Sequence, residues 1–375
     1  IPPMPDILMG EGVAKSMGRK IRDMKVSKIF LVTDPFMAKS GRAAEAADIL
    51  KKSGIATEIF AEVEPDPPIE LIERAGALYR ETGCNGILGL GGGSSLDTAK
   101  TLGLRVTHSG DLREYEGIVG GGGKIKPVFP PIICLPTTSG TGSEVNPCAV
   151  LTDKARDLKF ILMSNHFIPR LAVIDPLFTK TMPPGLTIES GIDALSHCIE
   201  GYVSLATPYH PYFESKALYG IKLIGRSLIT ACREPDNLRA RTDMCMAALC
   251  GGLAFLKGLG LGHALTHAIG AHYHVPHGRA AIFGLLGFVM ANRETCRDAF
   301  SDMAYLINRS DDLEGALRRL YTELQIDLRL KSYGISREAL KEIAFYTSRD
   351  AVNMATDPTS PGQSKILEML TSLYE

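Results

Sequence analysis

The first half of the chain alternates short, continuously apolar runs with amphipathic segments. The apolar runs, which we interpret as buried strands, cover residues 29–32, 57–60, 87–90, 132–135 and 171–174. Helical spacing of apolar positions predicts helices over residues 43–53, 69–82 and 94–104. Continuous apolar strands that alternate with helices are typical of a mainly parallel sheet covered on both faces, so we predict an α/β architecture for this half.

The pattern changes near residue 180. Pro183-Pro184-Gly185 marks a break in the chain, and little strand-like alternation follows it. The later segments have helical spacing, and we predict helices over residues 187–203, 213–233, 237–256, 262–271 and 280–292, with more toward the end of the chain. We therefore predict two domains, an α/β domain over residues 1–180 and an all-helical domain over residues 181–375.

Composition excludes several classes of function. The 375 residues are 45% hydrophobic and 22% charged, which is ordinary for a globular protein with more than one domain. The chain has 41 basic and 42 acidic residues, so it has no excess of positive charge that would attract nucleic acid or an anionic membrane surface. The longest apolar stretch, residues 280–291, is too short to span a bilayer. We therefore expect neither nucleic acid nor a membrane as a partner.

The cysteines and the start of the chain bear on the compartment. None of the eight cysteines forms a CxxC pair, and a chain of this length has no need of a disulfide framework. No charged segment followed by an apolar one opens the chain, so we expect no signal peptide. We predict a reducing, cytoplasmic location with buried, inert thiols.

Two loops at predicted strand ends could hold a nucleotide. Residues 91–95 (Gly-Gly-Gly-Ser-Ser) join a strand to a helix, where glycines and free N–H groups favour phosphate. This run is not a GxGxxG fingerprint, and alone it is equally well explained as a tight turn. Residues 136–144 (Pro-Thr-Thr-Ser-Gly-Thr-Gly-Ser-Glu) follow another strand and are rich in small donors. Two such loops on one sheet favour a nucleotide site more strongly than either alone.

Asp34 stands at the end of a predicted strand, before Pro35. A carboxylate there could accept hydrogen bonds from ribose hydroxyls and would repel a 2′-phosphate. Sequence spacing alone favours the simpler interpretation, a turn or helix-capping aspartate.

The strongest chemical signal is a concentration of histidines in the helical half. Seven of nine histidines lie between residues 197 and 277. Asp193 with His197, and His263 with His267, are spaced to share a helix face. His277 follows in a Pro-His-Gly sequence. A single histidine is more often a core or solvated residue, but this coincidence favours a divalent first-row metal.

Spacing does not choose the ligands. An HExxH site is excluded because Ala264 follows His263. One carboxylate and three imidazoles would make a suitable set, and His267, His272 and His274 stay candidates beside the residues above.

Four motifs in order resemble the iron-containing (group III) alcohol dehydrogenase family over essentially the whole chain. They are GGGSSLDTAK at 91–100, PTTSGTGSEV at 136–145, GIDALSHCIEGYVS at 191–204 and GLGHALTHAIGAHYHVPHGRAA at 260–281. The resemblance implies the dehydroquinate synthase-like fold of that family, with an N-terminal NAD-binding domain, an all-helical metal-binding and catalytic domain, and the active site in the cleft between them.

The resemblance also assigns site residues. Implied metal ligands are Asp193, His197, His263 and His277, with His267 as the unligated catalytic histidine in the proton path. Implied cofactor-binding residues are Asp34, Gly92, Gly93, Ser94, Asp97, Thr137, Thr138, Thr141 and Lys159. Asp34 at the adenosine ribose favours NAD over NADP. The family name puts Fe²⁺ first among divalent metals, with Zn²⁺ second.

The expected activity is hydride transfer between NAD(H) and a small primary or secondary alcohol or diol and its carbonyl compound, with the metal polarising the substrate oxygen. The alternatives are a glycerol-dehydrogenase-like zinc polyol dehydrogenase and, with less support, a dehydroquinate-synthase-like lyase or a non-catalytic nucleotide-binding protein. Lys257, Ala268 and Asp66 depart from the commonest family pattern, which leaves the substrate range open. We expect a homodimer or larger homo-oligomer.

Overall fold

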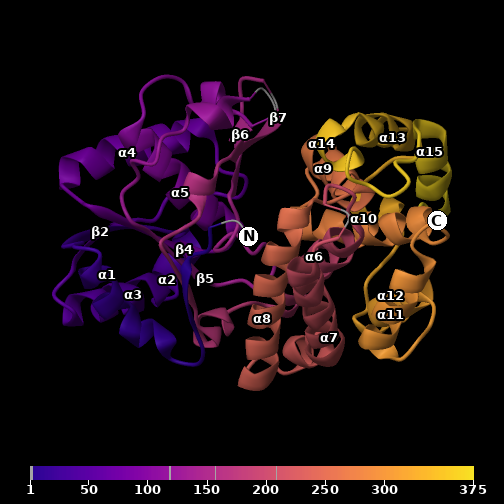
Figure 1. The fold of residues 1–375 in the computed structure, drawn as a ribbon, viewed down its shortest axis with the longest axis horizontal. Coiled ribbons are helices and arrows are strands. Elements are labelled where there is room, and N and C mark those ends of the chain that lie inside the picture. Colours follow the sequence, from indigo (N-terminus) through magenta and orange to yellow (C-terminus); the bar gives the residue numbers. More distant parts are fainter. Residues whose placement is uncertain (1–2, 118–119, 157, 208) are drawn as a thin grey trace. The chain divides into compact units, whose positions relative to one another are not determined.

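The chain divides into two compact units. The computed structural model describes residues 3–117, 120–156, 158–207 and 209–375. The first unit comprises Ile1–Thr138 and Ser143–Thr181, and the second comprises Ser139–Gly142 and Met182–Glu375. In Figure 1 the first is drawn in indigo to magenta and most of the second in mauve to yellow. Nothing in the sequence pattern indicated that residues 139–142 would group with the helices.

The first unit, the sheet unit, is built on six parallel strands. Their order is β1 (Asp6–Met9), β8 (Leu171–Ile174), β5 (Ile132–Pro136), β4 (Gly86–Gly91), β2 (Lys28–Val32) and β3 (Ala56–Phe60). The prediction of a mainly parallel sheet is confirmed. Strand β1 was not predicted, because this partly exposed strand has an apolar run of only three residues, 7–9.

Helices cover both faces of this sheet. The helices are α1 (Met17–Asp23), α2 (Pro35–Lys39), α3 (Arg42–Lys52), α4 (Ile69–Thr82) and α5 (Gly93–Thr107). Ile29 and Leu31 of β2 share one core cluster with residues of α1 and α3, while Phe30 and Val32 share another with residues of α4 and α5. Because successive side chains of a strand point to opposite faces, a strand buried on both faces must be continuously apolar.

A separate hairpin lies beside the parallel sheet. Strands β6 (Cys148–Asp153) and β7 (Leu158–Met163) pair antiparallel. The sequence reading missed both strands. Residues 148–151 (Cys-Ala-Val-Leu) and 160–163 (Phe-Ile-Leu-Met) are apolar runs of four residues, and these runs are the signal that could have identified the hairpin.

The second unit, the helical unit, contains helices and no strand among its described residues, as predicted from the helical spacing. Its α-helices are α6 (Pro184–Val203), α7 (Pro211–Arg233), α8 (Leu238–Ala254), α9 (Leu261–Tyr273), α10 (His277–Asn292), α11 (Arg297–Asn308), α12 (Leu313–Glu323), α13 (Ala339–Arg349), α14 (Ala351–Met354) and α15 (Gln363–Ser372). The break at Pro183 is a helix start, since Pro184 occupies the first turn of α6, where proline lacks only an N–H that would stay unpaired. Helix α6 is buried over most of its length, and it carries Asp193 and His197.

Short 3-10 turns connect these elements. They are η1 (Val13–Ser16), η2 (Leu112–Tyr115), η3 (Gly121–Lys124), η4 (Asn165–Phe167), η5 (Pro176–Thr179), η6 (Phe255–Lys257) and η7 (Leu330–Tyr333).

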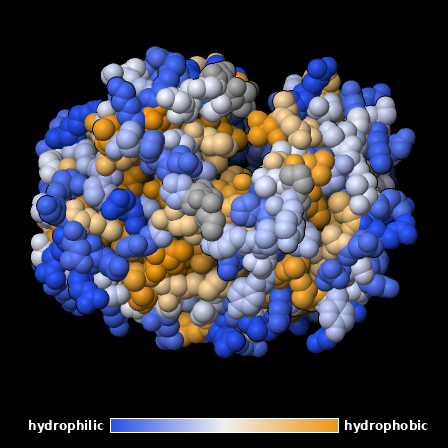
Figure 2. Space-filling model, viewed as in Figure 1, coloured by the Kyte–Doolittle hydropathy of each residue, from blue (hydrophilic) through white to orange (hydrophobic). Residues whose placement is uncertain are grey.

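The surface is mixed in character. Hydrophilic residues cover much of the face drawn in Figure 2, with apolar residues in smaller patches between them. Within the described ranges, no single helix has both the length and the apolarity to cross a membrane. One pair, Leu238–Lys257 with Leu261–Tyr273, passes that test by length and composition only and is bent by 104°.

Candidate metal centre and nucleotide loops

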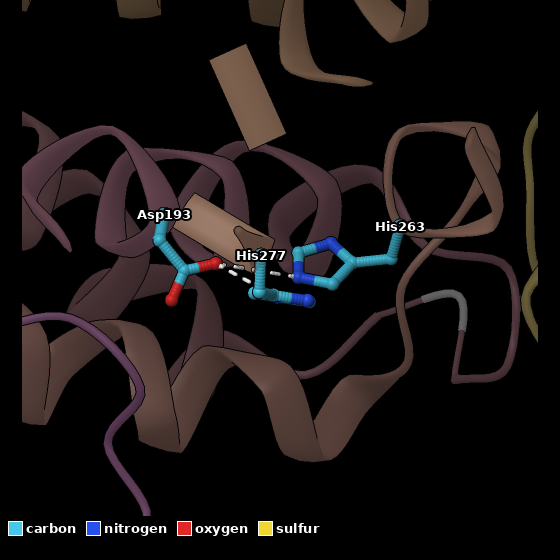
Figure 3. A group of neighbouring side chains, drawn as sticks. All are labelled: Asp193, His263 and His277. Carbon is cyan, nitrogen blue, oxygen red and sulfur yellow. Dashed lines mark ion pairs between the residues drawn. The ribbon is translucent and has the colours of Figure 1, made fainter. Parts of the chain in front are cut away.

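Three side chains from three helices of the helical unit meet at one point. Asp193 lies on α6, His263 on the first turn of α9, and His277 is the first residue of α10. Asp193 Oδ1 lies 3.7 Å from His263 Nε2 and 3.4 Å from His277 Nε2. Figure 3 shows the carboxylate directed at the two imidazoles. One ligand atom from each residue lies within 4.8 Å of the others, a spacing that would let them hold one ion.

These atoms are suited to a metal because they are typical ligand atoms and because two of them have no hydrogen-bond partner. Asp193 Oδ1 and His263 Nε2 are buried without a hydrogen-bond partner. Buried polar atoms without partners are costly, and a bound cation would satisfy both at once. An oxygen and two imidazole nitrogens suit Fe²⁺ or Zn²⁺, so the residues present fit the group that the sequence implied.

His197 lies against this cluster but outside the group of three. Its ring stacks on that of His263 with centroids 4.7 Å apart, and its Nδ1 lies 3.9 Å from Asp193 Oδ2. That Nδ1 is also buried without a hydrogen-bond partner. The structure therefore keeps His197 adjacent to the candidate ligands, and its role as a fourth ligand stays a prediction.

Glu200 supports the cluster from behind, and sequence reasoning missed it. Its Oε1 lies 2.7 Å from His263 Nδ1, and its Oε2 accepts from the backbone N–H groups of Gly260 and His263. Because a carboxylate only accepts hydrogen bonds, His263 must donate from Nδ1. This leaves the lone pair on Nε2 available to a metal ion. The only available signal was that Glu200 follows His197 by three residues on the same helix.

The electrostatics of this point favour positive charge. Burial alone would lower the pKa of His263, but the Glu200 and Asp193 carboxylates outweigh it and raise that pKa to about 10. Burial alone would raise the pKa of Asp193, but the neighbouring imidazoles hold it well below its usual range. A place that attracts a proton this strongly also attracts a metal cation.

Glu200→Gln is expected to weaken metal binding roughly 10- to 100-fold, the usual cost of losing the hydrogen-bond partner of a ligating histidine. The amide loses the charge and presents a donor to one of its present partners. Competition with a chromophoric chelator would measure the dissociation constant for Zn²⁺. Unchanged affinity in a correctly folded variant would contradict the role given to Glu200.

The other candidate histidines separate clearly. His267 Nδ1 lies 3.2 Å from Asp350 Oδ2, and its ring centroid lies 6.1 Å from that of His263 and 5.9 Å from that of His277. His272 is exposed and stacks on Tyr346 at 3.7 Å, and His274 is exposed at the end of α9. Only His267 of these three adjoins the cluster.

In the sheet unit, two loops meet at the carboxyl ends of β4 and β5. Gly91 has a φ of +147°, and a Cβ there would lie 2.4 Å from Ser95 Oγ, so the turn requires glycine. Gly92 precedes α5 and has no side chain to cap the helix start, which leaves first-turn N–H groups of Gly93 and Ser94 for an anion. A Cβ on Gly92 would touch Thr138 at 3.3 Å, so the two loops are in contact.

The threonines predicted to bind the cofactor fall on both units. Thr137 donates its backbone N–H to Gly91, and Thr138 lies beside Gly92. Thr141 belongs to the short segment of the helical unit, where a Cβ on neighbouring Gly142 would lie 2.4 Å from Gly252 Cα. The structure thus joins Thr137 and Thr138 to the glycine turn, and the role of Thr141 stays a prediction.

Asp97 and Lys100 form hydrogen bonds that hold the end of the loop after β5 and the residues that follow it. Asp97 accepts from Ser143 Oγ at 2.6 Å and from the Val150 N–H at 3.0 Å. The fully buried Lys100 donates to oxygens of Ser143, Asn146 and Cys148. Both carboxylate oxygens of Asp97 are engaged within the fold. Asp97 therefore holds this loop, and its role at the pyrophosphate stays a prediction.

Asp34 and Lys159 each have a partner within the chain. Asp34 Oδ1 accepts from the Met37 N–H and caps α2, as spacing alone had favoured. Its Oδ2 faces the glycine turn, since a Cβ on Gly91 would lie 3.3 Å from it. Lys159 Nζ, on β7, lies 2.7 Å from Asp66 Oδ1. The structure thus places Asp34 beside the glycine turn. It pairs Lys159 with Asp66, one of the three residues that depart from the commonest family pattern.

Comparison with known proteins covers both units. The model of the iron-containing alcohol dehydrogenase family matches residues 4–176. The model of the C-terminal part of the Fe-containing alcohol dehydrogenase family matches residues 187–374. Together the matches span nearly the whole chain, and they confirm the resemblance seen in the motifs.

Individual relatives agree with the family models. Alcohol dehydrogenase 4 of Saccharomyces cerevisiae (strain YJM789) is 31% identical over 383 residues, covering 100% of this chain and 98% of the relative. A crystal structure of 1,3-propanediol oxidoreductase has a TM-score of 0.94 at 30% identity, covering 100% and 99% of the two chains. Sulfoacetaldehyde reductase from Bifidobacterium kashiwanohense, solved in complex with NAD⁺, has a TM-score of 0.91 at 27% identity and covers 100% and 97%.

Proposed function

The chain belongs to the iron-containing alcohol dehydrogenase family and is an alcohol oxidoreductase, and from this premise we propose that it transfers hydride between NAD(H) and a small alcohol or diol and its carbonyl compound. The observation that carries the proposal is the meeting of Asp193, His263 and His277 with unpartnered buried ligand atoms. The names of its relatives, an alcohol dehydrogenase and a propanediol oxidoreductase, support the substrate class.

We assign the metal to Asp193, His263 and His277, with His197 as the fourth ligand and Fe²⁺ before Zn²⁺. A divalent metal at this point supplies a Lewis acid for the substrate oxygen. Asp193 and Glu200 contribute two negative charges that balance a divalent cation in a buried place. Glu200 keeps the Nε2 lone pair of His263 directed at the site.

His267 is the residue proposed to move the proton. Burial lowers its pKa, which favours the neutral imidazole, the form able to accept a proton from an alcohol. Its ring adjoins those of His263 and His277, so a hydroxyl held at the metal centre would lie close to it. In the reverse direction the same ring would return the proton to the product oxygen.

NAD is assigned to the sheet unit and supplies the hydride acceptor. Gly92, Gly93 and Ser94, at the start of α5, offer N–H groups and a positive helix end to the pyrophosphate. Thr137 and Thr138 line the adjoining loop. Asp34 Oδ2 would accept from the adenosine ribose and repel the 2′-phosphate of NADP. The NAD⁺ complex of sulfoacetaldehyde reductase supports this cofactor.

The proposal is tested by following nicotinamide absorbance during turnover. Anaerobically purified protein is stripped with a chelator, reloaded with Fe²⁺ or Zn²⁺, and assayed with NAD or NADP and a panel of alcohols and aldehydes. We expect metal-dependent formation of NADH from small alcohols or diols, with NAD preferred. Tight binding of metal and NADH without net turnover would contradict the proposal and favour a lyase or a non-catalytic role. Light scattering would test the expected homo-oligomer.

A further inference from the structure

We propose that Asp350 is a positioning residue that fixes the tautomer and orientation of His267, an inference that rests on the proposed proton-transfer role of that histidine. Asp350 stands between α13 and α14, 83 residues from His267 in the sequence. Neither the sequence motifs nor the metal group includes it.

Both carboxylate oxygens of Asp350 have hydrogen-bond partners that fix the orientation of the side chain. Oδ1 accepts from the backbone N–H of Asn353, so that Asp350 caps the short helix α14. Oδ2 accepts from Asn353 Nδ2 at 2.8 Å and faces His267 Nδ1 at 3.2 Å. Asp350 is held by these bonds in a largely buried place, since its side chain is 18% exposed. It therefore presents Oδ2 to the imidazole in one orientation.

This arrangement selects one form of the imidazole. If His267 Nδ1 carried the lone pair, it would face the carboxylate oxygen, and two acceptors would oppose each other at 3.2 Å. Asn353 Nδ2, at 3.4 Å, would offer that lone pair only a long hydrogen bond, and it already donates to Asp350. The charge-assisted bond to the carboxylate is the stronger of the two, so Nδ1 carries the hydrogen and Nε2 keeps the lone pair.

The chemical consequence lies in proton transfer. A neutral imidazole accepts a proton only at the nitrogen that carries the lone pair. With Nδ1 committed to Asp350, Nε2 is the atom that must take the proton from the substrate path. Asp350 touches neither substrate nor metal in this scheme and acts through His267 alone.

The test combines a spectroscopic and a kinetic readout on the zinc-loaded, full-length enzyme labelled with ¹⁵N-histidine. The resonances of His267 are assigned by their loss in His267→Gln. In the wild type we expect the Nδ1–H tautomer. In Asp350→Asn, whose amide presents a donor to His267 or to Asn353, we expect a shift toward Nε2–H. We also expect kcat to fall about 100-fold, while KM for the alcohol, zinc content and NADH affinity stay within about twofold.

Two further variants separate positioning from loss of structure. Glu342→Gln also changes a carboxylate to an amide on α13, at a side chain that accepts from the Tyr273 hydroxyl of α9 and has no hydrogen bond to His267. It should leave the tautomer and kcat unchanged. Asn353→Ser keeps the carboxylate facing His267 and should retain the Nδ1–H form even where Asp350→Asn folds poorly.

The outcomes decide the inference. Nε2–H in the wild type would overturn it, as would a tautomer and kcat that do not respond to Asp350→Asn. A fall in kcat matched by an equal loss of zinc or NADH binding would assign Asp350 a structural role instead. If the wild type turns over no alcohol while the tautomer still follows Asp350, the proposed function fails and the positioning by Asp350 stands.

Discussion

Replacing His263 with alanine is expected to abolish metal binding and turnover together. The change removes one of the three ligand atoms that lie within 4.8 Å of one another, and it leaves Glu200 as a buried carboxylate without its main partner. A Lewis acid contributes several kcal/mol to polarising an oxygen, so we expect turnover to fall by about a thousandfold or more.

Metal content after gel filtration, measured by mass spectrometry, and NADH absorbance during turnover check this prediction on the same samples. His272→Ala is the matched control, because His272 lies on the same helix but stacks on Tyr346 away from the cluster. That variant should retain metal and activity. A metal-free His263→Ala protein with wild-type turnover would refute the assigned centre.

A single methyl group added at Gly284 is expected to destabilise the helical unit strongly. Gly284 lies on α10 where that helix meets α9, and a Cβ there would be 2.3 Å from the carbonyl oxygen of Gly262 and 2.4 Å from Thr266 Oγ1. The backbone contact cannot be relieved by a rotamer change, so the helices must separate. Overpacking of this kind costs up to about 3 kcal/mol, and we expect Gly284→Ala near that limit.

The same substitution should also weaken metal binding, because α9 carries His263 and α10 carries His277. Urea unfolding with the chelated protein measures stability, and a chelator competition measures affinity. Gly185→Ala is the control, since Gly185 lies in the first turn of α6 with nothing within 4 Å of the added Cβ. It should be neutral or slightly stabilising. Equal stability of the two variants would show that the α9–α10 contact is not tight.

The sequence predicted the features that depend on local periodicity and on short motifs. The buried strands, the long helices and the break at Pro183 follow from the spacing of apolar residues, which each element must satisfy by itself. The paired spacings of Asp193 with His197 and of His263 with His267 were equally visible, because residues four apart share a helix face. The family motifs added the choice of His277 as a ligand and of the individual cofactor-binding residues.

The sequence did not show which partners an individual side chain has in the fold. The bonds that Asp97 accepts from Ser143 and Val150 could not be predicted from its motif, and its role at the pyrophosphate stays a prediction. Strand β1 was missed because its apolar run, residues 7–9, is only three residues long, whereas the hairpin strands carry apolar runs at 148–151 and 160–163 that were not interpreted as strands. The segment 139–142 groups with the helices because Gly140 and Gly142 permit close backbone contacts there, which no local pattern records.

The sequence by itself therefore determined the fold class, the family and the candidate metal ligands. Only the tertiary structure decided how two of those histidines are held. Glu200 meets His263 across 63 residues of sequence, and Asp350 meets His267 across 83. Hydrogen bonds between distant segments are set by how helices pack, and neither spacing nor composition carries that information. The tautomers of His263 and His267, on which the proposed metal binding and proton transfer depend, follow from those two contacts.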